Sequence, residues 1–532
     1  MVFQFLSFVR NNRVGAFLSG AAALFTYGPW LIHEDITVDS EIMIADPEAM
    51  LESWLGINRF GLVFTKKLFG MTSFVPFFSK LLTVVLLWLT AMFLAFCVYE
   101  WSGRQRRFGL FTAVFPVLYL TGPCFAEQFY FVLQSAEVAF ALLLCGLSVY
   151  GAGQYAVFRK SPLWAVGSAV LMIWAFGTYQ AMAAVVIALS VVLFMTAYLR
   201  KDTLKADESS FGWLFCGVRL AAVFLAGFIM YLAIASWVRF VFQGNAAYVD
   251  QMIHWRTEGF YQCLWYIIGE LKRVFYCYYP VFRQEFFWIL LLFSLSSLVW
   301  AAGRRKKGIL FYLAALGVFL ISPFFMTIVT GFYQPVRAHL VYPFVYAFAA
   351  AFLTAAFYPE EKEAGEKRKK VDGWRMWAAR GVTVLCLIFS WRQGYDMARL
   401  FQTIHRVSEE DIALTRDIYS KSQRLAAKEG ISIEDCTFIF LGKRGARLSE
   451  EDLRGDVIGC SFYQWDADSS IGSSRRIYDL MQALGLPAQE PVLSRYLDSL
   501  PFTKTMDCYP GENSILLDED TVIVKLSEPM LN

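Results

Sequence analysis

The sequence predicts a polytopic α-helical membrane protein with a smaller, polar α/β segment at its C-terminus. Of the 532 residues, 57% are hydrophobic and 17% are charged, whereas soluble domains carry about 25% charged residues. The apolar excess lies in long uncharged runs such as 81–98, which are typical of membrane spans. The net charge is only +3, and no basic stretch is interleaved with aromatic residues, which argues against a nucleic-acid partner.

We predict about eleven membrane spans, because that many apolar runs are separated by polar or charged residues. The first follows Arg10 and Arg13, and no small-residue cleavage site comes after it, so we expect it to remain as an anchor. The predicted spans are residues 14–32, 75–99, 109–121, 129–151, 163–177, 181–199, 212–238, 285–302, 309–329, 339–358 and 377–391.

The basic residues between the spans predict the orientation of the chain, because short cytoplasmic loops are enriched in Lys and Arg. The short connections around Gly122 and Tyr179 contain no Lys or Arg, whereas the alternate loops, which lie on the other side of the membrane, are basic. We therefore predict a cytoplasmic N-terminus and three outward segments: 33–74, 239–284 and the C-terminal segment from Arg392. The basic loops contain Arg104, Arg106, Arg107, Arg159, Lys160, Arg200, Lys201, Lys205, Arg304, Arg305, Lys306, Lys307, Lys362, Lys367, Arg368, Lys369, Lys370 and Arg375.

The composition changes after the last predicted span, so we divide the chain into a multi-span domain, residues 1–391, and a soluble α/β domain, residues 392–532. Ser408 is followed by three acidic residues, which is typical of a helix N-cap. Apolar residues at helical spacing continue to Leu425 and predict an amphipathic helix. Residues 437–441 and 521–526 are rich in β-branched and apolar residues and predict strands.

The first outward segment contains the densest group of acidic residues. Asp39 and Glu41 bracket Ser40 directly after the first span. A carboxylate held at the membrane surface can act as a general base toward a hydroxyl nucleophile. The alternative is that these acids are solvated loop charges. The group comprises Glu34, Asp35, Asp39, Glu41, Asp46, Glu48 and Glu52.

Two outward arginines are candidates for binding a phosphate. Arg59 precedes an apolar stretch that predicts a short interfacial helix, and Arg337 is the only cation in the turn before the tenth span. A guanidinium can hold two phosphate oxygens at once. The alternatives are a head-group anchor for Arg59 and a helix-capping cation for Arg337.

Polar residues inside or beside the apolar runs are a further group of candidates. Tyr179 and Gln180 lie in a tight outward turn, while Gln134 and Glu137 lie in the fourth predicted span. Ionisable residues within spans are often functional. Pairing inside the helix bundle is the alternative use of each. No spacing of His and Cys predicts a metal site, and nothing indicates a cofactor.

In succession, these short motifs resemble the integral-membrane GT-C-type glycosyltransferases, and more specifically the Gtr-type (type II) O-antigen and surface-polysaccharide glucosyltransferases. One departure is Asn58, where the family pattern has Gly before Arg59. The motifs that carry the resemblance are residues 38–41, Trp54, residues 58–62, 131–137, 178–180, 509–511, 514–515 and 522–526.

The resemblance implies transfer of a hexose, usually glucose, from polyprenyl phosphate to a surface polysaccharide at the outer face of a bacterial cell membrane. It also implies dependence on a polyprenyl-phosphate sugar synthase and a flippase. The residues implied are Asp39 and Glu41 as base, Arg59 and Arg337 for the donor phosphate, and Tyr179, Gln180, Gln134, Glu137 and Lys525 for substrate.

Proteins with two other functions would have a similar number of spans and a similar apolar surface. A flippase for lipid-linked sugars is expected to show repeated halves and charges near the middle of the membrane, whereas here the acids cluster outside. A polymerase or ligase uses polyprenyl carriers but moves whole glycans. Within the C-terminal segment, Phe462, Tyr463 and Trp465 are candidates either for stacking on an acceptor sugar or for core packing.

Overall fold

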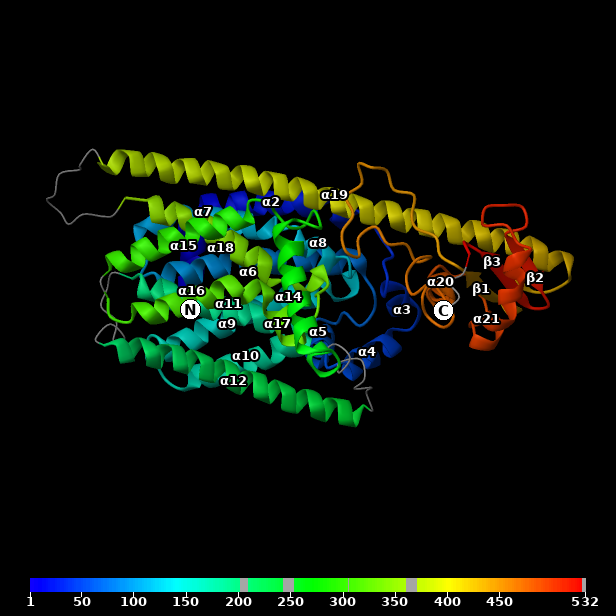
Figure 1. Cartoon of the computed structure of the whole chain (residues 1–532), viewed down its shortest axis with the longest axis horizontal. Helices are drawn as coiled ribbons and strands as arrows, with labels where there is room; N and C mark the ends of the chain where they lie inside the picture. The colour runs from blue at the N-terminus through cyan, green and yellow to red at the C-terminus, as the bar shows by residue number, and fades with distance from the viewer. Residues whose placement is uncertain (201–208, 243–252, 305, 360–370, 529–532) are drawn as a thin grey trace.

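The structure is a computed structural model that describes residues 1–200, 209–242, 253–304, 306–359 and 371–528. Helices form an elongated bundle, and the C-terminal segment extends from one end of it (Figure 1). Part of the predicted second outward segment, 243–252, lies outside the described residues. So do several of the basic residues used to predict the orientation: Lys201, Lys205, Arg305, Lys362, Lys367, Arg368, Lys369 and Lys370.

The bundle is built from apolar helices joined by short helices and turns. The first outward segment contains three short helices, α3, α4 and α5, which lie between the long helices α2 and α6. In order the helices are α1 (Val2–Asn11), α2 (Arg13–Ile32), α3 (Ser40–Ala45), α4 (Pro47–Gly56), α5 (Phe60–Leu68), α6 (Pro76–Trp101), α7 (Gly109–Leu120), α8 (Cys124–Phe129), α9 (Val132–Ala156), α10 (Leu163–Thr178), α11 (Met182–Tyr198), α12 (Ser210–Val241), α14 (Phe260–Phe275), α15 (Phe286–Gly303), α16 (Ile309–Ile321), α17 (Phe325–Thr330) and α18 (Val341–Phe357).

Each predicted span falls mainly on helical residues, and six described helical segments are long and apolar enough to cross a membrane. Three shorter apolar helices, α10, α11 and α18, also match predicted spans. The total of eleven spans stays a prediction. The six segments are Arg13–Ile32, Pro76–Trp101, Val132–Ala156, Ser210–Val241, Phe286–Gly303 and Ile309–Thr330.

Two of the predicted spans are interrupted. Residues 130–131 separate α8 from α9, so the span predicted at 129–151 begins too early; Phe131 has a non-helical backbone. The span predicted at 309–329 changes from α16 through a 3₁₀ turn to α17. Pro323 lies in that turn, and its missing N–H interrupts the helical hydrogen bonds.

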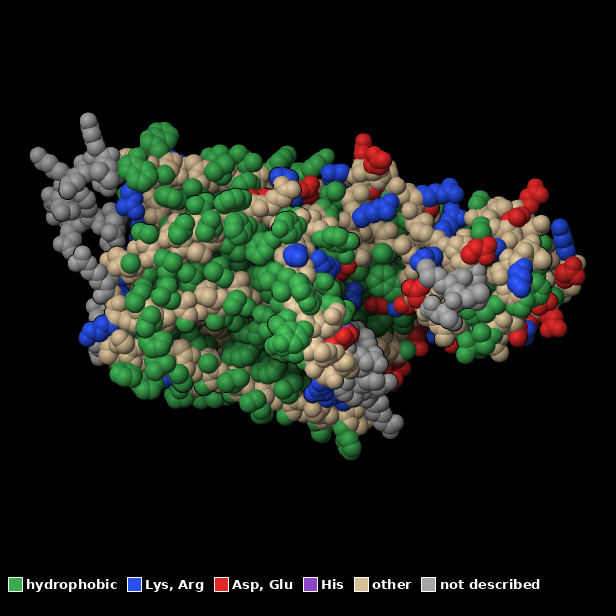
Figure 2. Space-filling model, viewed as in Figure 1, with side chains coloured by type: hydrophobic (Ala, Val, Ile, Leu, Met, Phe, Trp, Pro, Cys, Tyr) green, Lys and Arg blue, Asp and Glu red, His purple; other side chains and the backbone are tan. Residues whose placement is uncertain are grey.

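Aromatic residues one helical turn apart pack the bundle. Phe344, Phe348 and Phe352 follow one another along α18, with consecutive ring centroids 6.0 and 5.9 Å apart. Phe348 also contacts Phe293 of α15 and Phe111 of α7, each at 5.8 Å. In Figure 2, hydrophobic side chains cover most of the visible face of the bundle, and acidic and basic side chains gather over the C-terminal segment. This surface fits a membrane protein.

A single helix, α19 (Val371–Lys428), connects the bundle to the C-terminal segment. Its 58 residues span about 87 Å at 1.5 Å per residue. The predicted N-cap at Ser408 is wrong, because no helix breaker separates it from the preceding span. Ser408 instead lies buried within α19, where its Oγ accepts a hydrogen bond from Ile36 N at 3.0 Å. The predicted domain boundary at 391/392 also lies inside this helix.

The C-terminal segment holds a three-stranded sheet in the order β1-β3-β2. Strands β1 (Thr437–Leu441) and β3 (Thr521–Lys525) are parallel and buried along their whole length, as their apolar sequences predict. Strand β2 (Ile515–Asp518), which was not predicted, pairs antiparallel with β3. Helix α19 packs on the sheet through Tyr419 and Phe438, and α20 (Ser474–Ala483) and α21 (Leu493–Ser499) complete the segment.

Candidate functional site

Asp39 lies at the start of α3, in the left-handed backbone region with a φ of 73°. Few residues other than Gly adopt this conformation, although Asp and Asn do so more often than most. Thr37 and Ser40 hold the turn, since Ser40 N donates to Thr37 O at 2.9 Å and the two hydroxyls lie 3.1 Å apart. Uncommon backbone conformations of this kind cluster at functional sites.

The acid pair is bridged by Arg476, which lies on α20 in the C-terminal segment. Its Nη1 donates to Asp39 Oδ1 at 2.9 Å and to Glu41 Oε1 at 3.0 Å. Its Nε donates to Asp466 Oδ2 at 2.6 Å. One guanidinium therefore links three carboxylates and docks α20 onto the first outward segment. Sequence reasoning missed Arg476, because more than 430 residues separate it from the acids and no motif marks it.

The two acids lie in different environments. Glu41 is fully buried, whereas the side chain of Asp39 is 36% exposed. Burial raises the pKa of Glu41 to about 8; the Asp39 carboxylate also raises it, and Arg476 lowers it. Most Glu41 is therefore protonated at neutral pH. Asp39, which is reachable from solvent, is the better placed general base of the two.

A buried ion network fixes the chain just before the acid pair. Lys80 on α6 lies 3.5 Å from Asp35 Oδ2 and donates to His33 O at 2.6 Å. His405 Nδ1 on α19 lies 2.9 Å from Asp35 Oδ1, and its ring stacks on His33. The Asp39 loop is thus anchored to both α6 and α19.

Residues 130–137, which carry one of the family-like motifs, connect the acid loop to both predicted phosphate-binding arginines. Thr37 Oγ1 donates to Tyr130 O at 2.8 Å. The Arg337 guanidinium lies 4.8 Å from the centre of the Phe131 ring, and Arg59 Nη1 donates to Gln134 Oε1 at 2.9 Å. This short stretch of chain therefore contacts both predicted phosphate-binding arginines and the loop that carries Asp39 and Glu41.

Arg59 also meets the predicted turn at residues 179–180. Its guanidinium lies 5.3 Å from the centre of the Tyr179 ring, and Gln180 Nε2 donates to Ile57 O at 3.4 Å. Asn58 has a φ of 69°, a conformation that Gly adopts freely and Asn tolerates better than most residues. Asn58 therefore adopts a backbone conformation that a Gly at this position would also adopt freely.

Two of the predicted substrate-binding residues have structural partners. Glu137 lies 2.9 Å from Lys66, and both side chains are buried; Lys66 also donates to Leu133 O at 2.7 Å. Lys525 donates to Thr503 O at 2.7 Å and to Met506 O at 3.1 Å, and pairs with Glu528. None of these contacts joins Glu137 or Lys525 to Asp39 or the two arginines.

A second contact between the bundle and the C-terminal segment lies beside Arg337. Glu127 on α8 accepts hydrogen bonds from Asp456 N at 2.7 Å and Val457 N at 3.0 Å. Burial raises the pKa of Glu127 to about 7, and the charge of Arg337 opposes this shift. A Cβ at Gly455 would lie 1.6 Å from Glu127 Oε1, so only Gly fits there.

The aromatic candidates in the C-terminal segment divide into two groups. Phe462 and Tyr463 are buried, and Tyr463 Oη lies 2.8 Å from Thr415 Oγ1. These two side chains pack in the core, which was the alternative to sugar stacking. Trp465 is partly buried.

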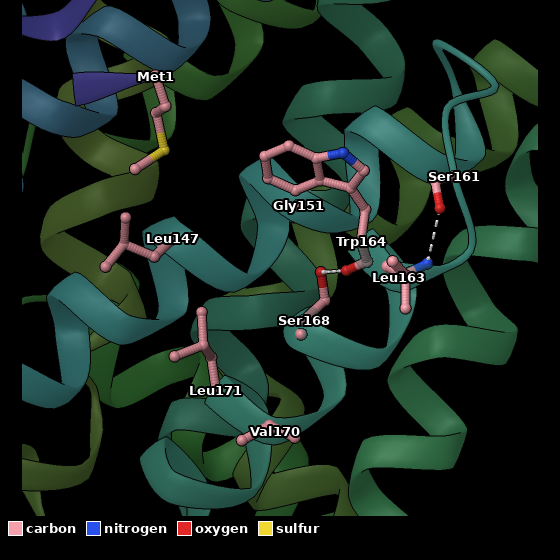
Figure 3. Close-up of a pocket in the computed structure, with 10 residues that line it drawn as sticks. Met1, Leu147, Gly151, Ser161, Leu163, Trp164, Ser168, Val170 and Leu171 are labelled. Carbon is pink, nitrogen blue, oxygen red and sulfur yellow. Dashed lines mark hydrogen bonds between the residues drawn. The ribbon is translucent and has the colours of Figure 1, made fainter. Parts of the chain in front are cut away.

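A cavity of about 740 Å³ lies elsewhere, between the end of α9 and the start of α10. In Figure 3, Met1, Leu147, Trp164 and Leu171 surround it. Ser168 Oγ donates to Trp164 O at 2.7 Å, and Ser161 Oγ accepts from Leu163 N at 3.3 Å. None of the ten lining side chains is ionisable, so this cavity lacks the groups that a hexose-transfer site needs.

An apolar helical bundle with an acid pair and arginines at one end fits the class of integral-membrane transferases. The family model described as glucosyl transferase GtrII matches residues 28–354, which include Asp39, Glu41, Arg59 and Arg337. The chain belongs to this glucosyltransferase family. No curated protein and no solved structure matches the chain.

Proposed function

We propose that the protein transfers a hexose, most simply glucose, from polyprenyl phosphate to a surface polysaccharide at the outer face of a bacterial cell membrane. The observation that carries the proposal is the contact of residues 130–137 with the acid loop, Arg59 and Arg337. These contacts bring the loop of the candidate base and the two candidate phosphate-binding arginines to the same stretch of chain. Membership of the glucosyltransferase family supports transfer of glucose.

In the proposed reaction, a hydroxyl of the acceptor sugar attacks the anomeric carbon of the donor. The bond between that carbon and the phosphate oxygen breaks, and Asp39 takes the proton of the hydroxyl. The leaving polyprenyl phosphate needs stabilisation of its charge, which a guanidinium provides. Arg59 and Arg337 would bind this phosphate, and the apolar helices would contact the polyprenyl chain.

The arrangement also fits the proposed sidedness and partners. A polyprenyl-linked donor at the outer face requires a synthase that makes it and a flippase that delivers it. The C-terminal segment, joined to the acid pair through Arg476, would bind the polysaccharide acceptor outside the cytoplasm.

A transfer assay tests the proposal. Membranes containing the protein would receive polyprenyl-phosphate [14C]glucose and the acceptor polysaccharide, and we expect one labelled hexose per modified repeat. Nucleoside-diphosphate glucose, given in parallel without a polyprenyl-phosphate synthase, should not support transfer. Transfer only in vesicles whose cytoplasmic face is outward would contradict the proposed sidedness, and transfer of whole glycans would indicate a polymerase or ligase.

Arg337→Ala should lose most binding of the polyprenyl phosphate product, whereas Arg337→Lys should keep part of it. The reason is that an ammonium carries the charge but cannot grip two phosphate oxygens. Arg59→Ala and Arg59→Lys should follow the same order. Binding would be measured on purified variants in detergent, with Arg447→Ala, an exposed position in the C-terminal segment, as control. Wild-type affinity in both alanine variants would show that neither arginine holds the phosphate.

A further inference from the structure

A groove with arginines at one end and apolar residues along its length lies between α15, α18 and α19. It encloses about 570 Å³. Its cations are Arg107 from the 3₁₀ turn Arg106–Phe108, Arg304 directly after α15, and Arg375 from α19. Three separate parts of the chain thus bring guanidinium groups to one groove.

The arginines are positioned by contacts with aromatic rings and carbonyl oxygens. The Arg107 guanidinium lies 4.0 Å from the centre of the Trp300 ring and donates to Tyr358 O at 3.0 Å. Arg304 lies 5.8 Å from the same ring, and Arg375 donates to Ala356 O at 3.4 Å. Trp300 is itself held by Phe352, with ring centroids 5.3 Å apart. The groove is therefore built from ordered side chains.

Most of the remaining lining is apolar, and part of it follows one face of α15. Leu295 and Val299 are spaced one helical turn apart, and Gly303 follows at the arginine end. The side chains of Leu295 and Val299 are exposed on the outside of the bundle. This strip extends about 12 Å from the arginines. A groove with a cationic end and an apolar strip matches an amphiphile with an anionic head and an acyl tail.

The groove is distant from the proposed transfer site. Lys80, near the start of α6, contacts the loop that carries Asp39, whereas Arg107 follows the other end of α6. The 21 residues from Lys80 to Trp101 span about 32 Å of helix. A lipid in this groove would lie in the leaflet opposite to the one that meets the acid pair.

We propose that this groove binds an anionic phospholipid, with the phosphodiester at Arg107, Arg304 and Arg375 and an acyl chain along Leu295 and Val299. Basic pockets between spans bind anionic lipid head groups in other membrane proteins. The inference does not depend on the proposed reaction, because it concerns a different end of the bundle.

Native mass spectrometry of the purified full-length protein tests the assignment, with phosphatidylglycerol as the probe. We expect one tightly retained phosphatidylglycerol, and Arg375→Gln should weaken its retention about fivefold. Arg375→Lys should retain most binding. The matched control is Arg380→Gln, also on α19, because Arg380 is exposed, contacts Trp377 and does not line the groove. Melting temperatures would confirm that the variants are folded.

Four results would overturn the proposal. The first is equal retention of phosphatidylcholine, and the second is unchanged retention in the Arg304→Gln/Arg375→Gln double variant. The third is stronger retention of polyprenyl phosphate than of phosphatidylglycerol, which would assign the groove to the carrier lipid. Displacement of the lipid by millimolar inorganic phosphate would also contradict it, because the acyl chain would then contribute nothing.

Discussion

Replacing Asp39 with Asn should lower hexose transfer by about 10²–10⁴-fold, which is the usual effect of removing a general base. Asn tolerates the left-handed backbone that Asp39 adopts, so the substitution removes the charge and leaves the turn intact. The rate would be measured in membranes at saturating donor, with the amount of inserted protein determined for each variant.

Glu41→Gln should retain more activity than Asp39→Asn at neutral pH. Burial raises the pKa of Glu41 to about 8, so the neutral amide resembles the form of Glu41 that predominates at pH 7. The matched control is Asp46→Asn, because Asp46 is an exposed acid of the same segment whose side chain caps α4, and Asn also caps helices. A wild-type rate of transfer by the Asp39→Asn variant would show that Asp39 is not the general base.

The sequence predicts the local features of this fold better than its long-range ones. The apolar runs place the helices of the bundle, because hydropathy depends on neighbouring residues alone. The same reasoning fails at Ser408, since a Ser followed by acids also occurs within a continuing helix, and here Ser408 is buried and bonded to Ile36 N, far away in the sequence. Strand β2, with four residues, is too short for its alternation to be distinctive.

The candidate site also combines residues that local motifs predict with long-range contacts that they do not predict. Asp39, Glu41, Arg59 and Arg337 were predicted from their residue types and from short motifs, and residues 130–137 contact both arginines and the loop that carries the two acids. The bridge from Arg476 could not be predicted, because it joins segments at opposite ends of the chain and depends on how α19 positions the C-terminal segment. The partner of Glu127 at residues 456–457 was missed for the same reason.

The bridge made by Arg476 predicts a change in the pH dependence of transfer. Its guanidinium lowers the pKa of Glu41, and burial alone would raise that pKa further. Arg476→Gln should therefore move the ionisation of Glu41, and the change in kcat/KM that it causes near pH 8 in the wild type, to higher pH. It should also lower the rate at pH 7 by about 10²-fold, because Asp39, the proposed base, loses the guanidinium that holds it. In the wild type, the ionisation of Glu41 places a second negative charge beside Asp39, so the profile should change at that pH. The profile would be measured between pH 6 and 9.

Two further variants separate this electrostatic role from a purely structural one. Arg476→Lys keeps the charge but cannot bridge three carboxylates with a planar fork, so its change in kcat/KM should occur at a pH between those of the wild type and Arg476→Gln. Arg475→Gln is the matched control, because Arg475 is the neighbouring residue of α20 and pairs instead with Asp479 and Glu490. If Arg476→Gln lowered the rate equally at every pH, the arginine would only hold α20 against the bundle. A change that moves to higher pH would instead mean that the C-terminal segment, through Arg476, sets the pH at which Glu41 ionises beside the proposed base.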